Sequence, residues 1–129
     1  MFLTSEDNSV SPSAFRHVNG SYWYRYFVRE PKSVGGIVHL SSWNYQNLFG
    51  LVLKRSERDQ FKFSHFEKCL QTLLDHLQLY RFNEVAFESF GDRFFMAKVT
   101  SVIKHVFEFS EQSFYICKPQ MGWTERRNR

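Results

Sequence analysis

The fold is decided by residues 47–89, which read "NLFGLVLKRSERDQFKFSHFEKCLQTLLDHLQLYRFNEVAFES". The apolar run at 47–54 predicts a strand, and the residues at 55–60 form a polar loop. Apolar residues then recur at three-and-four spacing, which is typical of one buried helical face. These residues are Phe66, Cys69, Leu70, Leu73, Leu74 and Leu77. A short apolar strand at 84–89 completes a strand–helix–strand unit.

The start of this helix carries an S-x-x-E pattern formed by Ser64 and Glu67. In such a capping box the two side chains bind backbone amides that the first helical turn leaves without partners. We therefore expect Ser64 to cap the helix.

Further elements flank this unit on both sides. Val99, Val102, Ile103, Val106 and Phe107 predict a second amphipathic helix, and "SFYIC" at 113–117 predicts a last strand. Strand–helix–strand–helix–strand order implies right-handed crossovers and a largely parallel sheet.

The N-terminal half is less regular. "GIVHL" at 36–40 predicts a strand that "SSWNYQ" connects to the strand at 47–54. Residues 1–14 indicate a loop or an irregular strand. The stretch "FRHVNGSYWYRYFVRE" at 15–30 is compatible with a strand and with a helix, and its pattern does not separate the two.

Composition is that of one soluble domain. The chain has 129 residues, of which 43% are hydrophobic and 23% charged. We expect a single domain at 1–118 and a basic C-terminal tail at 119–129. The aromatic share of 19% is high, so large rings should build much of the core or an exposed contact surface.

The location of the protein is indicated by its thiols and its hydropathy. Cys69 and Cys117 both fall in apolar positions of regular elements, where buried, reduced thiols are expected. Such thiols suit an intracellular protein, nuclear or cytoplasmic. The sequence shows neither a signal peptide nor a run of about 20 apolar residues, so we expect no membrane partner.

Most common chemical motifs are absent from the sequence. The histidines and cysteines lack metal-binding spacing, and the standard nucleotide-binding motifs do not occur, so we expect no metal and no cofactor. Ligands of parallel α/β sheets collect beyond the carboxyl ends of strands. Lys54 and Asp92 fall at two such ends, where they are candidates for a nucleophile and a general acid–base. Asp92 is equally placed to cap the second helix.

Three stretches carry a resemblance to a known family. "LFGLVLKRSERDQFKFSHFEKCLQTLLDHL", "EVAFESFGDRFFMAKVTSVIKHVFEFS" and "FYIC" resemble the C-terminal half of a macro domain, closest to the terminal ADP-ribose protein glycohydrolases. "LTSEDN" at 3–8 is similar to the family's second strand running into its ligand loop. The resemblance implies an α/β fold of three layers, with a mixed, mostly parallel sheet flanked by helices.

The resemblance also implies a set of site residues. Lys54 falls where the family has its nucleophilic lysine, and Asp92 falls on its catalytic aspartate. The implied chemistry is removal of ADP-ribose from acidic side chains, or of acyl groups from ADP-ribose, without a metal. Further ligand contacts are implied for Ser5, Asp7, Ser89, Phe90 and Gly91.

The sequence departs from the family pattern in its loops. "ESFGD" is shorter than the family's glycine-rich turn and keeps Gly91 alone, and Phe90 would place a ring where a ligand approaches the backbone. "NSVSPSAF" replaces the earlier glycine-rich loop, and the family's first strand and helix do not precede it. Because backbone amides hold the diphosphate in such loops, we expect ADP-ribose binding to be weak or lost.

Three functions follow as hypotheses. The first is a degenerate macro-type domain, a pseudo-enzyme that binds a protein partner or a second copy of itself. The second is an active ADP-ribose binder or ADP-ribosyl-protein hydrolase that uses Lys54 and Asp92. The third is a nucleic-acid-binding module in which interleaved rings and cations contact bases and phosphates. This third hypothesis uses the basic C-terminal tail together with Tyr22, Trp23, Tyr24, Arg25, Tyr26 and Arg29.

Overall fold

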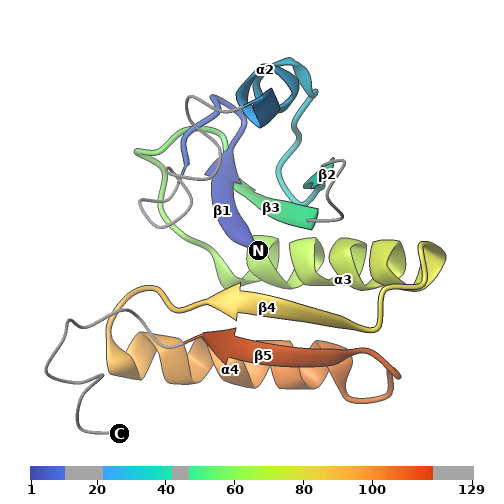
Figure 1. Ribbon diagram of the computed structural model, residues 1–129. Coiled ribbons are helices and arrows are strands. Elements are labelled where there is room, and N and C mark those ends of the chain that lie inside the picture. Colours follow the sequence, from blue (N-terminus) through green and yellow to red (C-terminus); the bar gives the residue numbers. More distant parts are fainter. Residues whose placement is uncertain (11–21, 42–46, 118–129) are drawn as a thin grey trace, which may run out of the picture.

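The chain folds into layers of helix, sheet and helix, in a computed structural model that describes residues 1–10, 22–41 and 47–117 (Figure 1). The remaining residues lie outside this description, and with them the tail expected at 119–129. The described helices are α2 (Tyr22–Arg29), α3 (Phe63–Leu79) and α4 (Arg93–Phe107). The described strands are β1 (Phe2–Ser5), β2 (Ile37–Ser41), β3 (Asn47–Lys54), β4 (Glu84–Glu88) and β5 (Ser113–Cys117).

The strands form a mixed, mostly parallel arrangement, as expected. β3 lies between β1, to which it is parallel, and β2, to which it is antiparallel. β4 and β5 form a second, parallel pair. The backbone nitrogen of Met1 donates a hydrogen bond of 3.0 Å to the carbonyl of Ala86, so β1 meets β4 where the two sets of strands adjoin.

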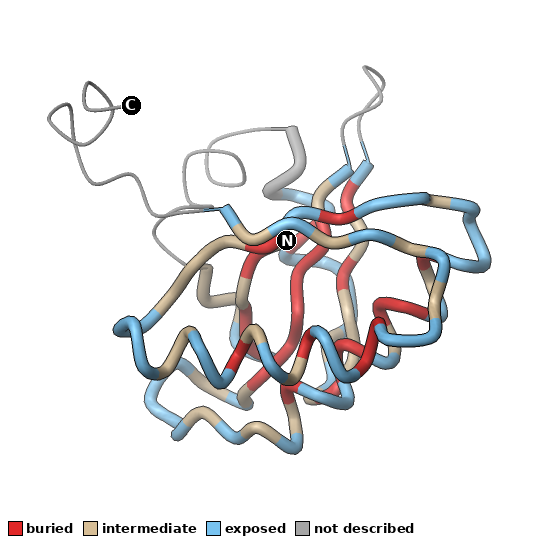
Figure 2. The backbone as a smooth tube through the Cα atoms, turned by 90° about the horizontal axis from the view of Figure 1, so that it is seen from below, coloured by how far each residue is buried: buried red, intermediate tan, exposed pale blue. Residues whose placement is uncertain are grey.

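β3 is buried on both of its faces, and different helices cover them. Phe49, Leu51 and Leu53 pack into a core with α3, α4 and β4. Val52 faces the opposite side, where it joins Phe27 of α2. Figure 2 shows this buried path running through the middle of the molecule. The three-layer α/β fold predicted from the sequence is therefore present.

A close ring contact sets the packing on the α2 side. The Phe2 ring lies 5.8 Å from the Phe27 ring in an edge-to-face arrangement. A Cβ atom at Gly50 would come within 2.8 Å of the Phe2 ring. Glycine at this position therefore allows β1 to bring Phe2 against β3.

The long helix α3 agrees with its sequence pattern in its buried face but not in its cap. All six residues of the predicted apolar face are buried. The helix, however, begins at Phe63, so Lys62 is the N-cap residue and its side chain makes no capping hydrogen bond. The predicted capping box is wrong, because Ser64 lies inside the first turn instead of before it.

The ambiguous stretch at 15–30 contains a helix in its described part. α2 spans Tyr22–Arg29 and buries Phe27 against the sheet, while Arg25, Tyr26 and Arg29 are exposed. The alternation of aromatic and basic residues is compatible with a strand when the sequence is considered alone. In the structure β2 and β3 already form the sheet, and α2 packs on it as a helix.

The two cysteines differ in their environments. The Cys69 thiol is buried in α3 and donates a hydrogen bond of 3.2 Å to the carbonyl of Val52. Burial raises the pKa of this thiol to about 12. Cys117 is exposed, which contradicts the prediction of a buried thiol. It ends β5, where alternate residues point away from the core.

We predict that thiol reagents will distinguish these cysteines. Because the thiolate is the reactive form, Cys69 should react at neutral pH only after unfolding, whereas Cys117 should react in the native protein. Colorimetric thiol titration with and without guanidinium measures both, and Cys117→Ser should remove the native reaction. A native protein with two rapidly reacting thiols would contradict the buried position of Cys69.

The same thiol predicts a dependence of stability on pH. The pKa of Cys69 in the folded protein is raised above the ordinary value of 9.0. The stability that the neutral thiol contributes is therefore fully present below pH 9 and is lost as the pH rises toward 12.

Candidate functional site

The carboxyl ends of β1 and β3 meet at one edge of the sheet. The strands are parallel, and Ser5 pairs with Lys54 at their ends. The backbone amide of Glu6 donates a hydrogen bond of 2.9 Å to the Lys54 carbonyl, so the chain after β1 stays close to β3. Lys54 therefore lies at the strand edge at which the sequence places a ligand site.

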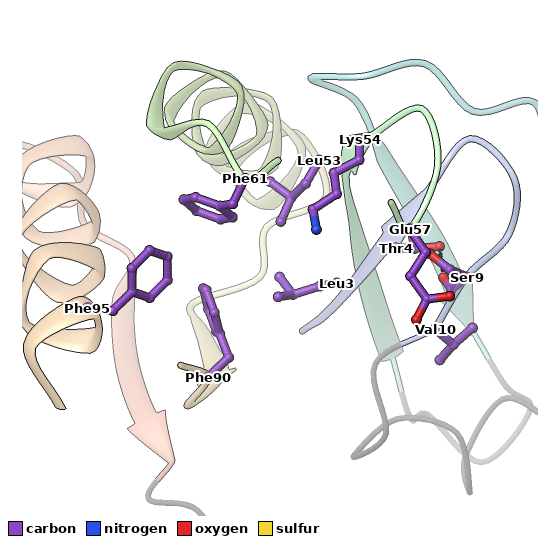
Figure 3. Close-up of a pocket in the computed structure, with 10 residues that line it drawn as sticks. All are labelled: Leu3, Thr4, Ser9, Val10, Leu53, Lys54, Glu57, Phe61, Phe90 and Phe95. Carbon is purple, nitrogen blue, oxygen red and sulfur yellow. Dashed lines mark hydrogen bonds between the residues drawn. The ribbon is translucent and has the colours of Figure 1, made fainter. Parts of the chain in front are cut away.

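A cavity of about 280 Å³ opens beside Lys54. We call it the Lys54 cavity. It is lined by Leu3, Thr4, Ser9, Val10, Leu53, Lys54, Glu57, Phe61, Phe90 and Phe95 (Figure 3). The residues come from β1 and the end of β3, from the loops that follow β1, β3 and β4, and from the first turn of α4.

The walls of this cavity differ in chemistry. Figure 3 shows the rings of Phe61, Phe90 and Phe95 on one side and the side chains of Thr4, Ser9 and Glu57 on the other. The ammonium group of Lys54 points into the space between them. Within the described residues, no hydrogen bond or ion pair engages the side chain of Lys54 or Glu57. One cation and one carboxylate thus face a ligand-sized space next to an aromatic wall.

Phe90 forms part of the wall and leaves the cavity open. Its ring centre lies 6.0 Å from that of Phe61, 6.2 Å from that of Phe66 and 5.8 Å from that of Phe95. These contacts hold the ring against the start of α3 and α4. The aromatic residue expected to obstruct the site is therefore packed to one side.

Gly91 and Asp92 connect β4 to α4. Gly91 has a φ of +74°, and a Cβ atom there would approach the Phe95 ring to 2.6 Å, so both backbone and packing require glycine. The Asp92 carboxylate accepts a hydrogen bond of 2.7 Å from the backbone amide of Phe95 and caps α4. Asp92 is exposed and does not line the Lys54 cavity. The predicted cap is present, and the predicted catalytic role of Asp92 stays a prediction.

The other predicted ligand contacts lie around the cavity but not in its lining. The buried Ser5 hydroxyl donates to Asp7 and lies 2.6 Å from the Ser9 hydroxyl. The Ser89 hydroxyl donates to the carbonyl of Cys117 and ties the turn to β5. Of the predicted site residues, the structure thus brings Lys54 and Phe90 to the cavity.

Sequence reasoning missed several residues of the site. Glu57 lies in the polar loop at 55–60, three residues after Lys54, and a loop that folds back over a strand end leaves no periodic signal. Thr4 and Ser9 face the cavity because the Thr4 hydroxyl donates to the Ser9 carbonyl and an isolated β-bridge joins Thr4 to Val10. For Phe61 and Phe95 the only signal in the sequence is its high share of aromatic residues.

Metal binding and membrane insertion receive no support from the described residues. No group of three or more His, Cys, Asp and Glu side chains within them is arranged to hold a metal ion. None of their helices is both long enough and apolar enough to cross a bilayer.

Comparison with solved structures identifies the fold. The macrodomain of Thermus aquaticus DarG matches with a TM-score of 0.68 and 16% sequence identity, covering 91% of this chain and 88% of that chain. The chain has the macrodomain fold. The macrodomain of Mycobacterium tuberculosis DarG matches with a TM-score of 0.60 and 12% identity, covering 83% and 76% of the two chains. No protein-family model and no curated protein matches the sequence.

The macrodomain resemblance seen in the sequence is therefore confirmed at the level of the fold. The two structures share few residues with this chain, so the match establishes its architecture and not its ligand.

We predict that Asp92 contributes to stability mainly as a helix cap. Asp92→Ala should lower the free energy of unfolding by about 1 kcal/mol, whereas Asp92→Asn should retain most of it because asparagine caps as well as aspartate. Urea denaturation measures both changes. An equal loss in the two variants would show that the carboxylate charge matters beyond the cap.

Proposed function

We propose that this protein binds ADP-ribose, or an ADP-ribosyl group on a larger substrate, in the Lys54 cavity. The observation that carries the proposal is the ammonium group of Lys54, which faces an open cavity at the carboxyl end of β3 in a macrodomain fold. An anionic ligand would supply the negatively charged partner that Lys54 does not have among the described residues. The aromatic wall would cover the apolar faces of a base or a ribose.

The loops of the cavity suggest modest affinity. The turn between β4 and α4 contains one glycine, Gly91, and Gly91 does not line the cavity. The cavity volume of about 280 Å³ lies just under the range of roughly 300–1,000 Å³ typical of small-molecule sites. A ligand as large as ADP-ribose would therefore extend past the rim, which agrees with the weak binding expected from the sequence.

Lys54 and Glu57 together would support removal of an acyl-linked ADP-ribosyl group. Glu57 would take a proton from the Lys54 ammonium group. The amine formed in this way would attack the anomeric carbon and form a C–N bond while the C–O bond to the acyl group breaks and the carboxylate leaves. Water would then hydrolyse the C–N bond, releasing ADP-ribose and restoring the lysine. In this proposal Glu57 takes the part that the resemblance assigned to Asp92.

We predict that Lys54→Ala will weaken ADP-ribose binding about tenfold or more, since one charge-assisted hydrogen bond is worth at least that factor. Isothermal titration calorimetry measures the affinity. Lys98→Ala is the matched control, because Lys98 is exposed on α4 outside the cavity. No heat from the unmodified protein at high micromolar ADP-ribose would overturn the proposal.

The two carboxylates can be separated in the same protein. With an O-acyl-ADP-ribose substrate, Glu57→Gln should abolish turnover while leaving ADP-ribose binding in place, and Asp92→Asn should retain both. Loss of turnover in Asp92→Asn alone would return the catalytic role to Asp92.

A second function, self-association, is favoured by an uncovered sheet face. Ala86, Tyr115 and Cys117 lie on exposed positions of β4 and β5, and Tyr115 is 55% exposed. Within the described residues no helix packs on this face, and β5 pairs with β4 alone. The same face carries Glu84 and Glu88, so it is mixed in character, and the unpaired edge of β5 beside it is what a second copy of this chain could extend. Nucleic-acid binding through α2 stays a prediction.

We predict a dimer that Tyr115→Lys disrupts, because the exposed Tyr115 ring would be lost from the contact between the two copies. Size-exclusion chromatography with light scattering gives the mass. Phe109→Lys is the control, since Phe109 is 95% exposed elsewhere. A protein that remains monomeric at high concentration would contradict self-association.

A further inference from the structure

A second cavity adjoins the Lys54 cavity at the end of β3 and shares Leu53 and Lys54 with it. Its volume is about 530 Å³, within the range of roughly 300–1,000 Å³ typical of small-molecule sites. We call it the basic cavity. It is lined by Val34, Leu53, Lys54, Arg55, Asp59, Gln60, Lys62 and His65. These residues come from the chain before β2, the end of β3, the loop that follows it, and the first turn of α3.

The lining carries an excess of positive charge. Lys54, Arg55 and Lys62 are cationic and His65 is a fourth basic group, against the single carboxylate of Asp59. Lys54 and His65 are half-buried, so water screens their charge less than that of a fully exposed side chain.

The carboxylates of Asp59 and Glu6 accept hydrogen bonds from the backbone. The Asp59 carboxylate accepts a hydrogen bond of 3.1 Å from the amide of Arg55, and the Asp59 amide donates one of 3.1 Å to the Ser56 carbonyl. Glu6 likewise accepts a hydrogen bond of 3.0 Å from the amide of Val34 at the rim. Within the part of the chain that the structure describes, no ion pair neutralises Arg55, Lys62 or His65.

Several unpaired cations around one concave space repel each other, and a multivalent anion relieves that repulsion. Arginine and lysine serve such a ligand in different ways. The guanidinium group donates two parallel hydrogen bonds to phosphate oxygens, and the ammonium group acts as a compact charge.

We propose that the basic cavity is a binding site for the phosphate group of a small organic phosphate. Arg55 and Lys62 hold the phosphate, and Gln60 and His65 contact the rest of the ligand. Leu53 and Lys54 line both cavities, but Arg55 and Lys62, which hold the phosphate, line the basic cavity alone, so the site does not depend on ADP-ribose binding in the Lys54 cavity. It thus adds a second ligand position beside the proposed function.

The test measures the binding of inorganic pyrophosphate to the full chain at low ionic strength. The variant Arg55→Gln/Lys62→Gln replaces two exposed side chains and should keep the fold, which thermal unfolding checks. It should weaken pyrophosphate binding about tenfold or more, because each charge-assisted hydrogen bond is worth about that factor. The control Lys98→Gln/Lys104→Gln removes the same net charge from α4 and should change the affinity by less than about twofold.

A second measurement locates the ligand. On addition of pyrophosphate, amide shifts in the NMR spectrum should change at residues 55, 59, 60, 62 and 65, which line the basic cavity alone, more than at Glu57 and Phe61 of the Lys54 cavity. In calorimetry, Arg55→Gln/Lys62→Gln should leave ADP-ribose binding intact, whereas Lys54→Ala should weaken it, so the two proposals fail separately.

Three results would overturn the basic cavity as a phosphate site. The first is an unmodified protein that does not bind pyrophosphate. The second is a variant at Arg55 and Lys62 that binds it as well as before. The third is an equal loss in the α4 control, which would mean attraction by net charge alone.

Discussion

Burial of β3 on both faces at once is the constraint on which the rest of the molecule depends. Leu51 and Leu53 pack under α3, and Val52 between them packs on the α2 side. The Cys69 thiol adds a hydrogen bond from α3 to the Val52 carbonyl. Because the apolar run stops at Leu53, Lys54 is the first side chain that can leave the core. Core packing therefore determines the position of Lys54, independently of any ligand that binds there.

The same packing determines the loop that follows. α3 must begin at Phe63 for its apolar face to cover β3, so eight residues turn over the edge of the sheet between Lys54 and Phe63. The turn is closed by the Asp59 carboxylate on the Arg55 amide. This short connection places Glu57 towards one cavity and Arg55 towards the other. Core packing and site chemistry are therefore linked through one loop.

The parts predicted from the sequence are those with a strong period. The six buried residues of α3 repeat at helical spacing, and the strands at 47–54, 84–89 and 113–117 are short apolar runs, so both appear where expected. The stretch containing α2 could not be assigned, because alternating aromatic and basic residues satisfy a strand and a helix equally. The capping box failed for a local reason: the helix started one residue before Ser64. Cys117 was predicted to be buried but is exposed, because it ends an edge strand that has one face in water.

The site was predicted to the extent that it depends on strand ends. Lys54 follows directly from the end of an apolar strand, and Asp92 from the turn before a helix. The position of Glu57 could not be predicted, because the conformation of a loop depends on contacts such as the Arg55–Asp59 hydrogen bond, and residue spacing gives no sign of these contacts. Phe90 was expected to obstruct the ligand, but the direction of its ring depends on contacts with Phe61 and Phe66, which lie more than 20 residues earlier in the sequence, and with Phe95.

The turn at 55–59 is a common wall of the two cavities, and this has a thermodynamic consequence. If a ligand in one cavity shifts the turn, the affinity of the other cavity changes by some factor. Linkage requires the reciprocal effect to be of equal size and sign. Such coupling would make the two cavities an effector pair within a single small domain, with the Arg55–Asp59 hydrogen bond as the element that both ligands bias.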